Sequence, residues 1–176
     1  PLLCALRDRI RSEEGHPHIV RIGAAGGIST PSAVASAFAL GAAYVVTGTV
    51  NQACKEAGTS PMVKQMLADA HVYDVGMAPA SDMFEAGIEV QVLKRGTLFA
   101  MRGTKLYELY RAHDSLESIP KETREKLEKQ LFRRPINEVW NDCVDFFTDR
   151  DPAQLERAAA EPKHKMALIF RWYLGM

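Results

Sequence analysis

The sequence predicts an α/β fold in residues 1–80 and a mostly helical region with a short β-ribbon in residues 81–176. Three observations support this division. Two short apolar runs in the first part each end near a glycine and lead into a helical pattern, as buried parallel strands do. Apolar and polar residues begin to alternate after Ser81, as in a half-exposed strand. Helical patterns then continue almost to the end of the chain.

Prolines mark the beginnings of the predicted helices. Proline suits the first helical turn because its missing N–H would be unpaired there. Six of the nine prolines stand at such places: Pro31, Pro61, Pro120, Pro135, Pro152 and Pro162. In the first part we expect helices at 2–11, 31–40, 50–57 and 61–70, strands at 19–25 and 43–47, and a loop at 71–80. In the second part we expect ribbon strands at 88–93 and 97–101 and helices at about 105–112, 120–133, 135–148, 152–160 and 163–174.

The composition excludes several classes of protein. Hydrophobic residues make up 47% of the chain and charged residues 25%, which is typical of a globular protein with a core. Basic and acidic residues balance at 22 each, so net charge favours neither a nucleic acid nor a membrane surface as partner. No apolar run reaches the roughly 18 residues of a membrane span. Cys4, Cys54 and Cys143 match no metal or redox spacing and are expected to be reduced, buried thiols of a cytoplasmic protein.

A glycine-containing loop between the first strand and the next helix is the most informative segment. The strand runs into Gly26 and Gly27, and the helix then begins with Thr30 as N-cap and Pro31 in its first turn. Glycines let a ligand approach the backbone closely, and the free N–H groups and dipole of a helix start attract an anion. The first turn, 31–34, contains no carboxylate that would repel one. The pattern favours a phosphate site.

The second strand ends in a similar way. Thr47-Gly48-Thr49 follows it about 22 residues after the first loop. In a (β/α)₈ barrel, the loops after strands 7 and 8 commonly form one shared phosphate site. Two ordinary turns of any parallel α/β protein would look the same, so this alternative stays open. A Rossmann site would need G-x-G-x-x-G and an acidic residue after the second strand, and a P-loop would need Gly-Lys-Ser/Thr; neither pattern is present.

Longer stretches of the sequence resemble a known family. The two glycine loops and Ala39-Leu40-Gly41-Ala42 resemble the phosphate-binding half of nitronate monooxygenase-like flavoproteins. Several further segments are similar to the PfaD family, the trans-acting enoyl reductases of polyunsaturated fatty acid and polyketide synthases. These segments are Thr49-Val50-Asn51-Gln52, Glu56-Ala57-Gly58-Thr59-Ser60, residues 78–85, Val90-Gln91-Val92-Leu93-Lys94, residues 105–110 and His113-Asp114-Ser115-Leu116.

The resemblance implies the C-terminal part of an FMN-binding (β/α)₈ barrel with a helical addition. It implies an enzyme in which NADPH reduces FMN and FMN reduces an enoyl thioester on an acyl carrier protein. By position, Gly26, Gly27, Gly48 and Thr49 would bind the FMN phosphate, with Asn51 and Gln52 as weaker candidates. The alternative is a phosphate-binding barrel without flavin that acts as a lyase or isomerase.

The family's front half, with most barrel strands and a Gly-Gly-His segment, is expected before Pro1, and a last stretch is expected after Met176. The remaining half of the same barrel is therefore an expected partner, and we expect residues 1–176 alone to be inactive.

Other polar residues carry less information. His16 and His18 lie in a polar loop, and we expect them at the barrel end opposite the active site. His71, His113 and His164 are isolated and are expected to be surface residues or to cap helices. Asp82 and Glu85 would lie near a flavin or substrate, or belong to a helix start capped by Ser81 and Asp82. We nominate no catalytic acid or base and no metal ligand. The aromatic residues near the end of the chain recur at helical spacing and are expected in the core: Trp140, Phe146, Phe147, Phe170 and Trp172.

Residues 120–134 carry an excess of positive charge. Three carboxylates (Glu122, Glu125, Glu128) stand against six basic residues: Lys121, Arg124, Lys126, Lys129, Arg133 and Arg134. The excess would steer an acidic carrier protein toward this helix. The alternative is a solvated helix face with Glu122–Lys126 and Glu125–Lys129 pairs.

Overall fold

The structure, a computed structural model, describes residues 1–175 and divides into two compact units. The first unit spans Pro1–Asp69 and the second begins at Ala70. The expected boundary lay near residue 80. The division falls earlier because residues 75–79 form a strand that pairs within the second unit.

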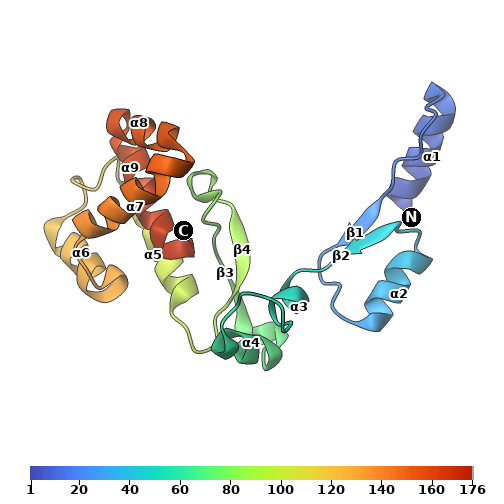
Figure 1. Cartoon of the computed structure of the whole chain (residues 1–176), viewed down its shortest axis with the longest axis horizontal. Helices are drawn as coiled ribbons and strands as arrows, with labels where there is room; N and C mark the ends of the chain where they lie inside the picture. The colour runs from blue at the N-terminus through green and yellow to red at the C-terminus, as the bar shows by residue number, and fades with distance from the viewer. Residues whose placement is uncertain (176) are drawn as a thin grey trace. The chain divides into compact units, whose positions relative to one another are not determined.

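The first unit contains one parallel pair of strands and four helices (Figure 1). Its elements are α1 (Leu2–Glu14), β1 (Gly23–Ala25), α2 (Pro31–Ala39), β2 (Tyr44–Val46), α3 (Thr49–Gln52) and α4 (Pro61–Ala68). The predicted strands and their parallel direction are confirmed, although both are shorter than predicted. Residues 19–21 lie outside the ladder because no strand among residues 1–175 pairs with them. The helix expected at 50–57 ends at Gln52.

The second unit combines an antiparallel ribbon with a group of helices (Figure 1). Its elements are η1 (Val72–Asp74), β3 (Val75–Pro79), η2 (Phe84–Ala86), β4 (Glu89–Leu93), α5 (Phe99–Ala112), α6 (Lys121–Lys126), the π-helical turn η3 (Leu127–Phe132), α7 (Ile136–Arg150), α8 (Pro152–Ala160) and α9 (Pro162–Gly175). All six prolines singled out in the sequence stand at the N-cap or first turn of a helix.

Two predictions for the ribbon were wrong. The strand Glu89–Leu93 pairs with Val75–Pro79, in a segment predicted as a loop, and residues 97–101 belong to a turn and to the start of α5. Gly76, Ala78 and Pro79 have low strand propensity, which hid β3 from the sequence pattern. Pro79 at the end of a two-stranded ribbon is compatible with pairing because edge positions tolerate a missing N–H.

The hydrophobic core lies in the second unit. It is built around Phe84, Leu106, Met166 and Phe170, which are fully buried. Of the aromatic residues expected in the core, Phe147 and Phe170 are buried, while Trp140, Phe146 and Trp172 pack partly exposed against it. In the first unit Ala37 is the one buried hydrophobic residue, and Phe38, Tyr44 and Val46 are exposed. The strands of the first unit therefore have uncovered apolar faces.

The three thiols differ more than the sequence suggested. Cys143 is buried in the core and donates to the Leu168 carbonyl oxygen, but Cys4 is half-buried and Cys54 is exposed. Burial, reinforced by the neighbouring Asp142 carboxylate, raises the pKa of the Cys143 thiol to about 12. The thiolate is the reactive form, so Cys143 is inert at neutral pH.

This burial predicts the alkylation pattern. Iodoacetamide applied to the native full-length protein at pH 8 should leave Cys143 unmodified, as read from the mass of its peptide. In guanidinium chloride the same thiol should be modified fully. Rapid modification of Cys143 under native conditions would contradict its burial between α7 and α9.

Candidate functional site

The parallel pairing of β1 with β2 determines the geometry of the candidate site. Gly23 pairs with Tyr44, Ala24 with Val45 and Ala25 with Val46. Parallel strands in this register end at the same edge. The loop after Ala25 and the loop after Val46 therefore leave the sheet side by side, although about 22 residues separate them in the sequence.

The first loop has the backbone that its two glycines permit. Gly26 and Gly27 adopt φ angles of +88° and +68°, in the left-handed region that side chains disfavour. A Cβ at either position would point into open space. Among residues 1–175 neither glycine N–H donates a hydrogen bond. The loop thus presents two accessible donors.

Helix α2 follows this loop and begins as predicted. Thr30 Oγ1 accepts a hydrogen bond from the Ala33 N–H at 3.2 Å, and Pro31 occupies the first turn. The first turn contains no acidic residue. The positive end of the helix dipole is therefore not neutralised by the chain's own carboxylates.

The second loop is stabilised by Asn51. Its amide nitrogen donates to the Thr47 carbonyl oxygen at 3.1 Å, and its amide oxygen accepts from the Thr47 hydroxyl at 3.0 Å. Both polar ends of Asn51 are therefore engaged within the loop. The N–H groups of Gly48 and Thr49 donate to nothing among residues 1–175, and both residues are exposed. The exposed Gln52 follows at the end of α3.

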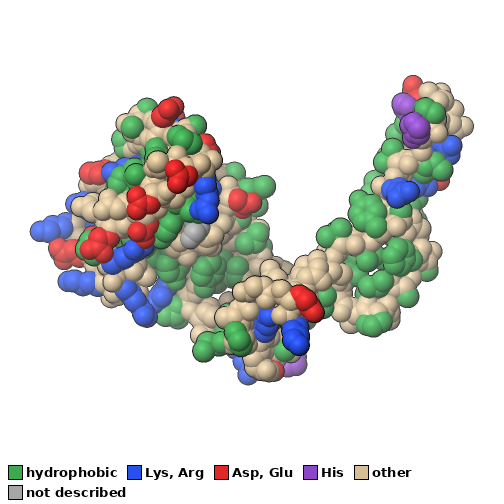
Figure 2. All heavy atoms as spheres, in the orientation of Figure 1, with side chains coloured by type: hydrophobic (Ala, Val, Ile, Leu, Met, Phe, Trp, Pro, Cys, Tyr) green, Lys and Arg blue, Asp and Glu red, His purple; other side chains and the backbone are tan. Residues whose placement is uncertain are grey.

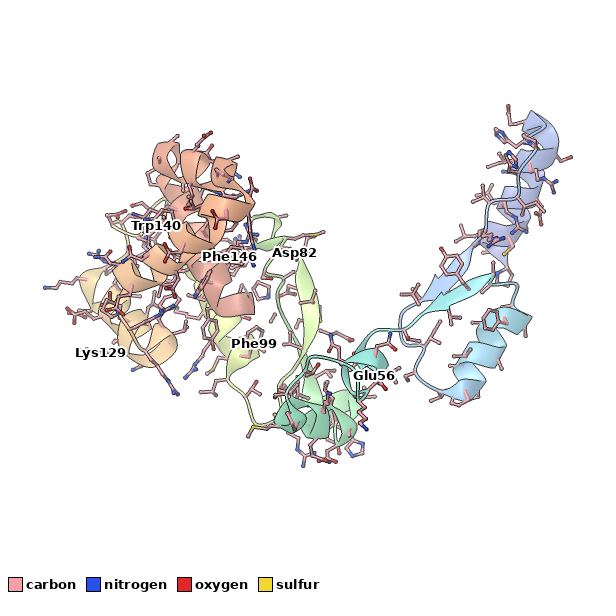
Figure 3. All side chains as sticks on the ribbon, in the orientation of Figure 1. Glu56, Asp82, Phe99, Lys129, Trp140 and Phe146 are labelled. Atoms are coloured by element: carbon pink, nitrogen blue, oxygen red, sulfur yellow. The ribbon has the colours of Figure 1, made fainter. Side chains whose placement is uncertain are left out.

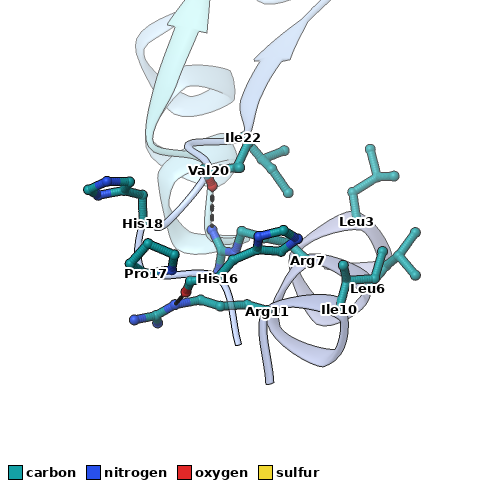
Figure 4. Close-up of a pocket in the computed structure, with 10 residues that line it drawn as sticks. All are labelled: Leu3, Leu6, Arg7, Ile10, Arg11, His16, Pro17, His18, Val20 and Ile22. Atoms are coloured by element: carbon teal, nitrogen blue, oxygen red, sulfur yellow. Dashed lines mark hydrogen bonds between the residues drawn. The ribbon is translucent and has the colours of Figure 1, made fainter. Parts of the chain in front are cut away.

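A hollow of about 510 Å³ lies at the other end of β1 (Figure 4). Its apolar lining includes Leu6 and Ile10 of α1 and Val20 of the segment before the strand, and Arg7 donates to the Val20 carbonyl oxygen at 3.4 Å. His16 and His18 also line it. The hollow adjoins the amino end of β1, the edge opposite to the glycine loops.

The prediction for His164 was wrong. This residue of α9 is only 1% exposed, and its ring links η2 to α8. Its Nδ1 lies 2.8 Å from Glu85 Oε1, and its Nε2 lies 2.9 Å from Gln154 Oε1. The Gln154 amide nitrogen donates to Asp151, so its oxygen is left to accept. Each ring nitrogen of His164 therefore has one polar partner.

Glu85 therefore has a structural partner. It also pairs with Arg157 of α8 at 3.2 Å, so this one carboxylate joins the β3–β4 loop to α8 and α9. Ser81 and Asp82 do not cap η2, and Asp82 is exposed on that loop (Figure 3). Spacing could not reveal the Glu85–His164 contact, because 79 residues separate the two.

Two further ionisable groups have raised pKa values. Burial, together with the nearby Glu85 carboxylate, raises the pKa of the Tyr110 hydroxyl. Tyr110 and Cys143 thus stay protonated at neutral pH. Residues 1–175 contain no group of three or more His, Cys, Asp or Glu side chains placed to hold a metal ion. No helix in this part of the chain is long and apolar enough to cross a membrane.

The basic segment is exposed, as in the solvated-face alternative, but the described residues lack the two ion pairs expected there. Neither the Glu122–Lys126 nor the Glu125–Lys129 pair forms among the described residues; instead Lys121 lies 4.0 Å from Glu125. Arg134 pairs with Asp142 of α7. Lys126, Lys129 and Arg133 are exposed without a carboxylate partner in residues 1–175.

Comparisons with known families agree with this architecture. The sequence model described as nitronate monooxygenase matches residues 5–130. The model described as the inserted helical domain of [acyl-carrier-protein] S-malonyltransferase matches residues 113–176. The two matches meet in the second unit.

Individual relatives are similar over nearly the whole chain. One of the polyunsaturated fatty acid synthase subunits of Thraustochytrium sp. is 49% identical over 100% of this chain and 12% of its own length. The polyketide biosynthesis protein PksE of Bacillus subtilis is 44% identical over 98% of this chain and 22% of its own length. The crystal structure of the enoyl reductase domain of MlnA, from the macrolactin biosynthesis cluster of Bacillus amyloliquefaciens, superimposes with a TM-score of 0.85 and 40% identity.

The MlnA match covers 99% of this chain and 39% of that structure, so the chain corresponds to a minor part of each relative's length. These matches and the structure confirm the predicted fold class, the C-terminal part of a (β/α)₈ barrel with a mostly helical addition. The chain belongs to the nitronate monooxygenase family and, within it, to the PfaD-like proteins.

Proposed function

We propose that the full-length protein is an FMN-dependent enoyl reductase in polyketide or polyunsaturated fatty acid synthesis, and that this chain binds the flavin phosphate. The observation that carries the proposal is the common edge of β1 and β2, where two loops offer unpaired N–H groups. Similarity to parts of polyunsaturated fatty acid and polyketide synthases supports the metabolic role.

The residues at this edge fit a phosphate. Gly26, Gly27, Gly48 and Thr49 would donate backbone N–H groups, and the Thr49 hydroxyl would add a fifth donor. The open space around the two positive-φ glycines leaves room for phosphate oxygens that a Cβ would displace. The uncompensated start of α2 adds favourable potential. Asn51 would hold the second loop in shape, and Gln52 would contact the cofactor from the end of α3.

A flavin held here would supply hydride-transfer chemistry between NADPH and the β-carbon of an enoyl thioester on an acyl carrier protein, whose α-carbon would also take up one proton. The role of this chain would be to anchor one end of the cofactor, since no acid or base is nominated from residues 1–175. The remaining half of the barrel would enclose the reacting ring and exclude water from it.

Replacing Gly27 by Asp tests the phosphate site. The substitution puts a carboxylate among donors that the proposal assigns to a dianion, so the purified full-length protein should lose most of its FMN. Flavin content per polypeptide, from absorbance after denaturation, measures the effect.

Two variants separate charge from other causes. Gly27→Asn has nearly the same shape and also places a side chain at positive φ, and it should retain clearly more flavin than Gly27→Asp. Gly58→Asp adds the same charge at an exposed glycine of ordinary backbone conformation and should retain it fully. Full flavin in Gly27→Asp would refute the phosphate assignment. If the unsubstituted full-length protein binds phosphate but no flavin, the lyase or isomerase alternative would be favoured.

Residues 1–176 expressed alone should not catalyse the NADPH-dependent reduction of a crotonyl thioester. A closed barrel needs eight strands and about 250 residues, whereas the described residues supply one parallel pair with exposed apolar faces. Activity should appear when the other barrel segments are supplied as a second polypeptide. Turnover by the isolated chain with bound FMN would contradict the strand count.

A further inference from the structure

A groove of about 800 Å³ runs between α5 and the continuous helix formed by α6 and η3. Its floor is apolar, with contributions from Leu109, Leu127 and Leu131. At its mouth Leu98 and Met101 are 54% and 63% exposed. Large apolar side chains that remain this accessible next to a groove are typical of a surface that binds a partner.

The rim of the groove is basic. Arg102 and Lys105 of α5 and Lys126 of α6 line it, against a single carboxylate, Glu108. That carboxylate lies 3.4 Å from Lys105. No carboxylate among residues 1–175 forms an ion pair with Arg102 or Lys126. The groove therefore combines an apolar floor with positive charge that nothing in this part of the chain neutralises.

The π-helical turn shapes one wall of the groove. Residues 127–132 follow a wider helix than α6, which changes the direction of Gln130 and Leu131 relative to a regular helix. Arg133 then ends the helix in the left-handed conformation, with φ of 59°. Isolated π turns often occur at functional sites. Figure 2 shows Lys and Arg side chains gathered on the side of the second unit that carries α6, and Figure 3 places Lys129 there.

We propose that this groove docks an acidic, amphipathic helix of the acyl carrier domain that presents the substrate. An amphipathic helix lays apolar side chains into such a groove, and its carboxylates would pair with Arg102 and Lys126. Complementary charge also accelerates association. The identity of the partner rests on the proposed function, whereas the chemistry of the surface does not.

The charges argue against another apolar segment of the same protein as the occupant. Such a segment would bury Arg102 and Lys126 without a counter-charge, and buried unpaired charges are costly. An acidic helix removes this cost because it supplies the missing carboxylates.

Charge reversal in the full-length enzyme tests the groove. The double variant Arg102→Glu, Lys126→Glu should raise the KM for the crotonyl-loaded acyl carrier protein by about tenfold or more. The KM of this variant should no longer depend on salt concentration. Turnover of crotonyl-pantetheine, which has no carrier, should not change. Arg111→Glu is the matched control, because Arg111 is an exposed residue of α5 that does not line the groove. It should leave both reactions unchanged.

Two additional measurements keep the outcomes distinct. Met101→Gln retains every charge and should weaken carrier binding without changing the reaction of free thioester. Fluorescence anisotropy of a labelled holo-carrier should show the same losses directly. If the unsubstituted full-length protein reduces neither thioester, the reductase proposal fails. The anisotropy measurement would still show whether the carrier binds in the groove. The docking proposal would be overturned if the double variant kept the KM and the carrier affinity of the unsubstituted protein. It would also be overturned if the double variant lost as much activity with crotonyl-pantetheine as with the carrier-bound substrate.

Discussion

The candidate site depends on one interaction, the parallel pairing of β1 with β2. The three residue pairs from Gly23–Tyr44 to Ala25–Val46 set the relative positions of two loops that the sequence keeps apart. A shift of register by one residue would turn every side chain of one strand to the opposite face and displace one loop against the other. The glycines alone would not make a site; they provide accessible N–H groups, and the ladder brings the two sets together. Since parallel strands are normally covered on both faces, the same pairing explains why Tyr44 and Val46 need neighbours that residues 1–175 do not provide.

The second unit is stable for a different reason. It has a continuous core around Phe84, Leu106 and Phe170, and the Glu85–His164 pair ties the β3–β4 loop to that core. The pair is satisfied on every side, by Arg157 at the carboxylate and by Gln154 at the far ring nitrogen. Buried polar groups with complete hydrogen bonding hold one arrangement in preference to others. This network joins the β3–β4 loop, which carries Asp82, to α8 and α9.

Local chemistry decided which features could be predicted from the sequence. The helix starts were predictable because a proline in the first turn acts within its own segment, as at Pro61 and Pro152. The positions of the two parallel strands and the N-cap at Thr30 were also predictable, because their signals lie within their own segments. Strand β3 was missed because Gly76 and Pro79 carry no strand signal and its pairing partner lies beyond a loop. His164 was misjudged because its partners come from distant parts of the chain, and a single sequence contains no signal for such contacts. Asn51 and Thr47 lie only four residues apart, yet no residue pattern indicated the two hydrogen bonds between them.

The most direct measurement of the central claim is a crystal structure of the full-length protein with FMN. The account predicts that the phosphate lies at the carboxyl edge of β1 and β2. The backbone nitrogens of Gly26, Gly27, Gly48 and Thr49 should then lie about 2.7–3.2 Å from phosphate oxygens. Contacts from both loops to the same phosphate would support the account. A phosphate bound elsewhere, or bound by one loop while the other faces solvent, would contradict it.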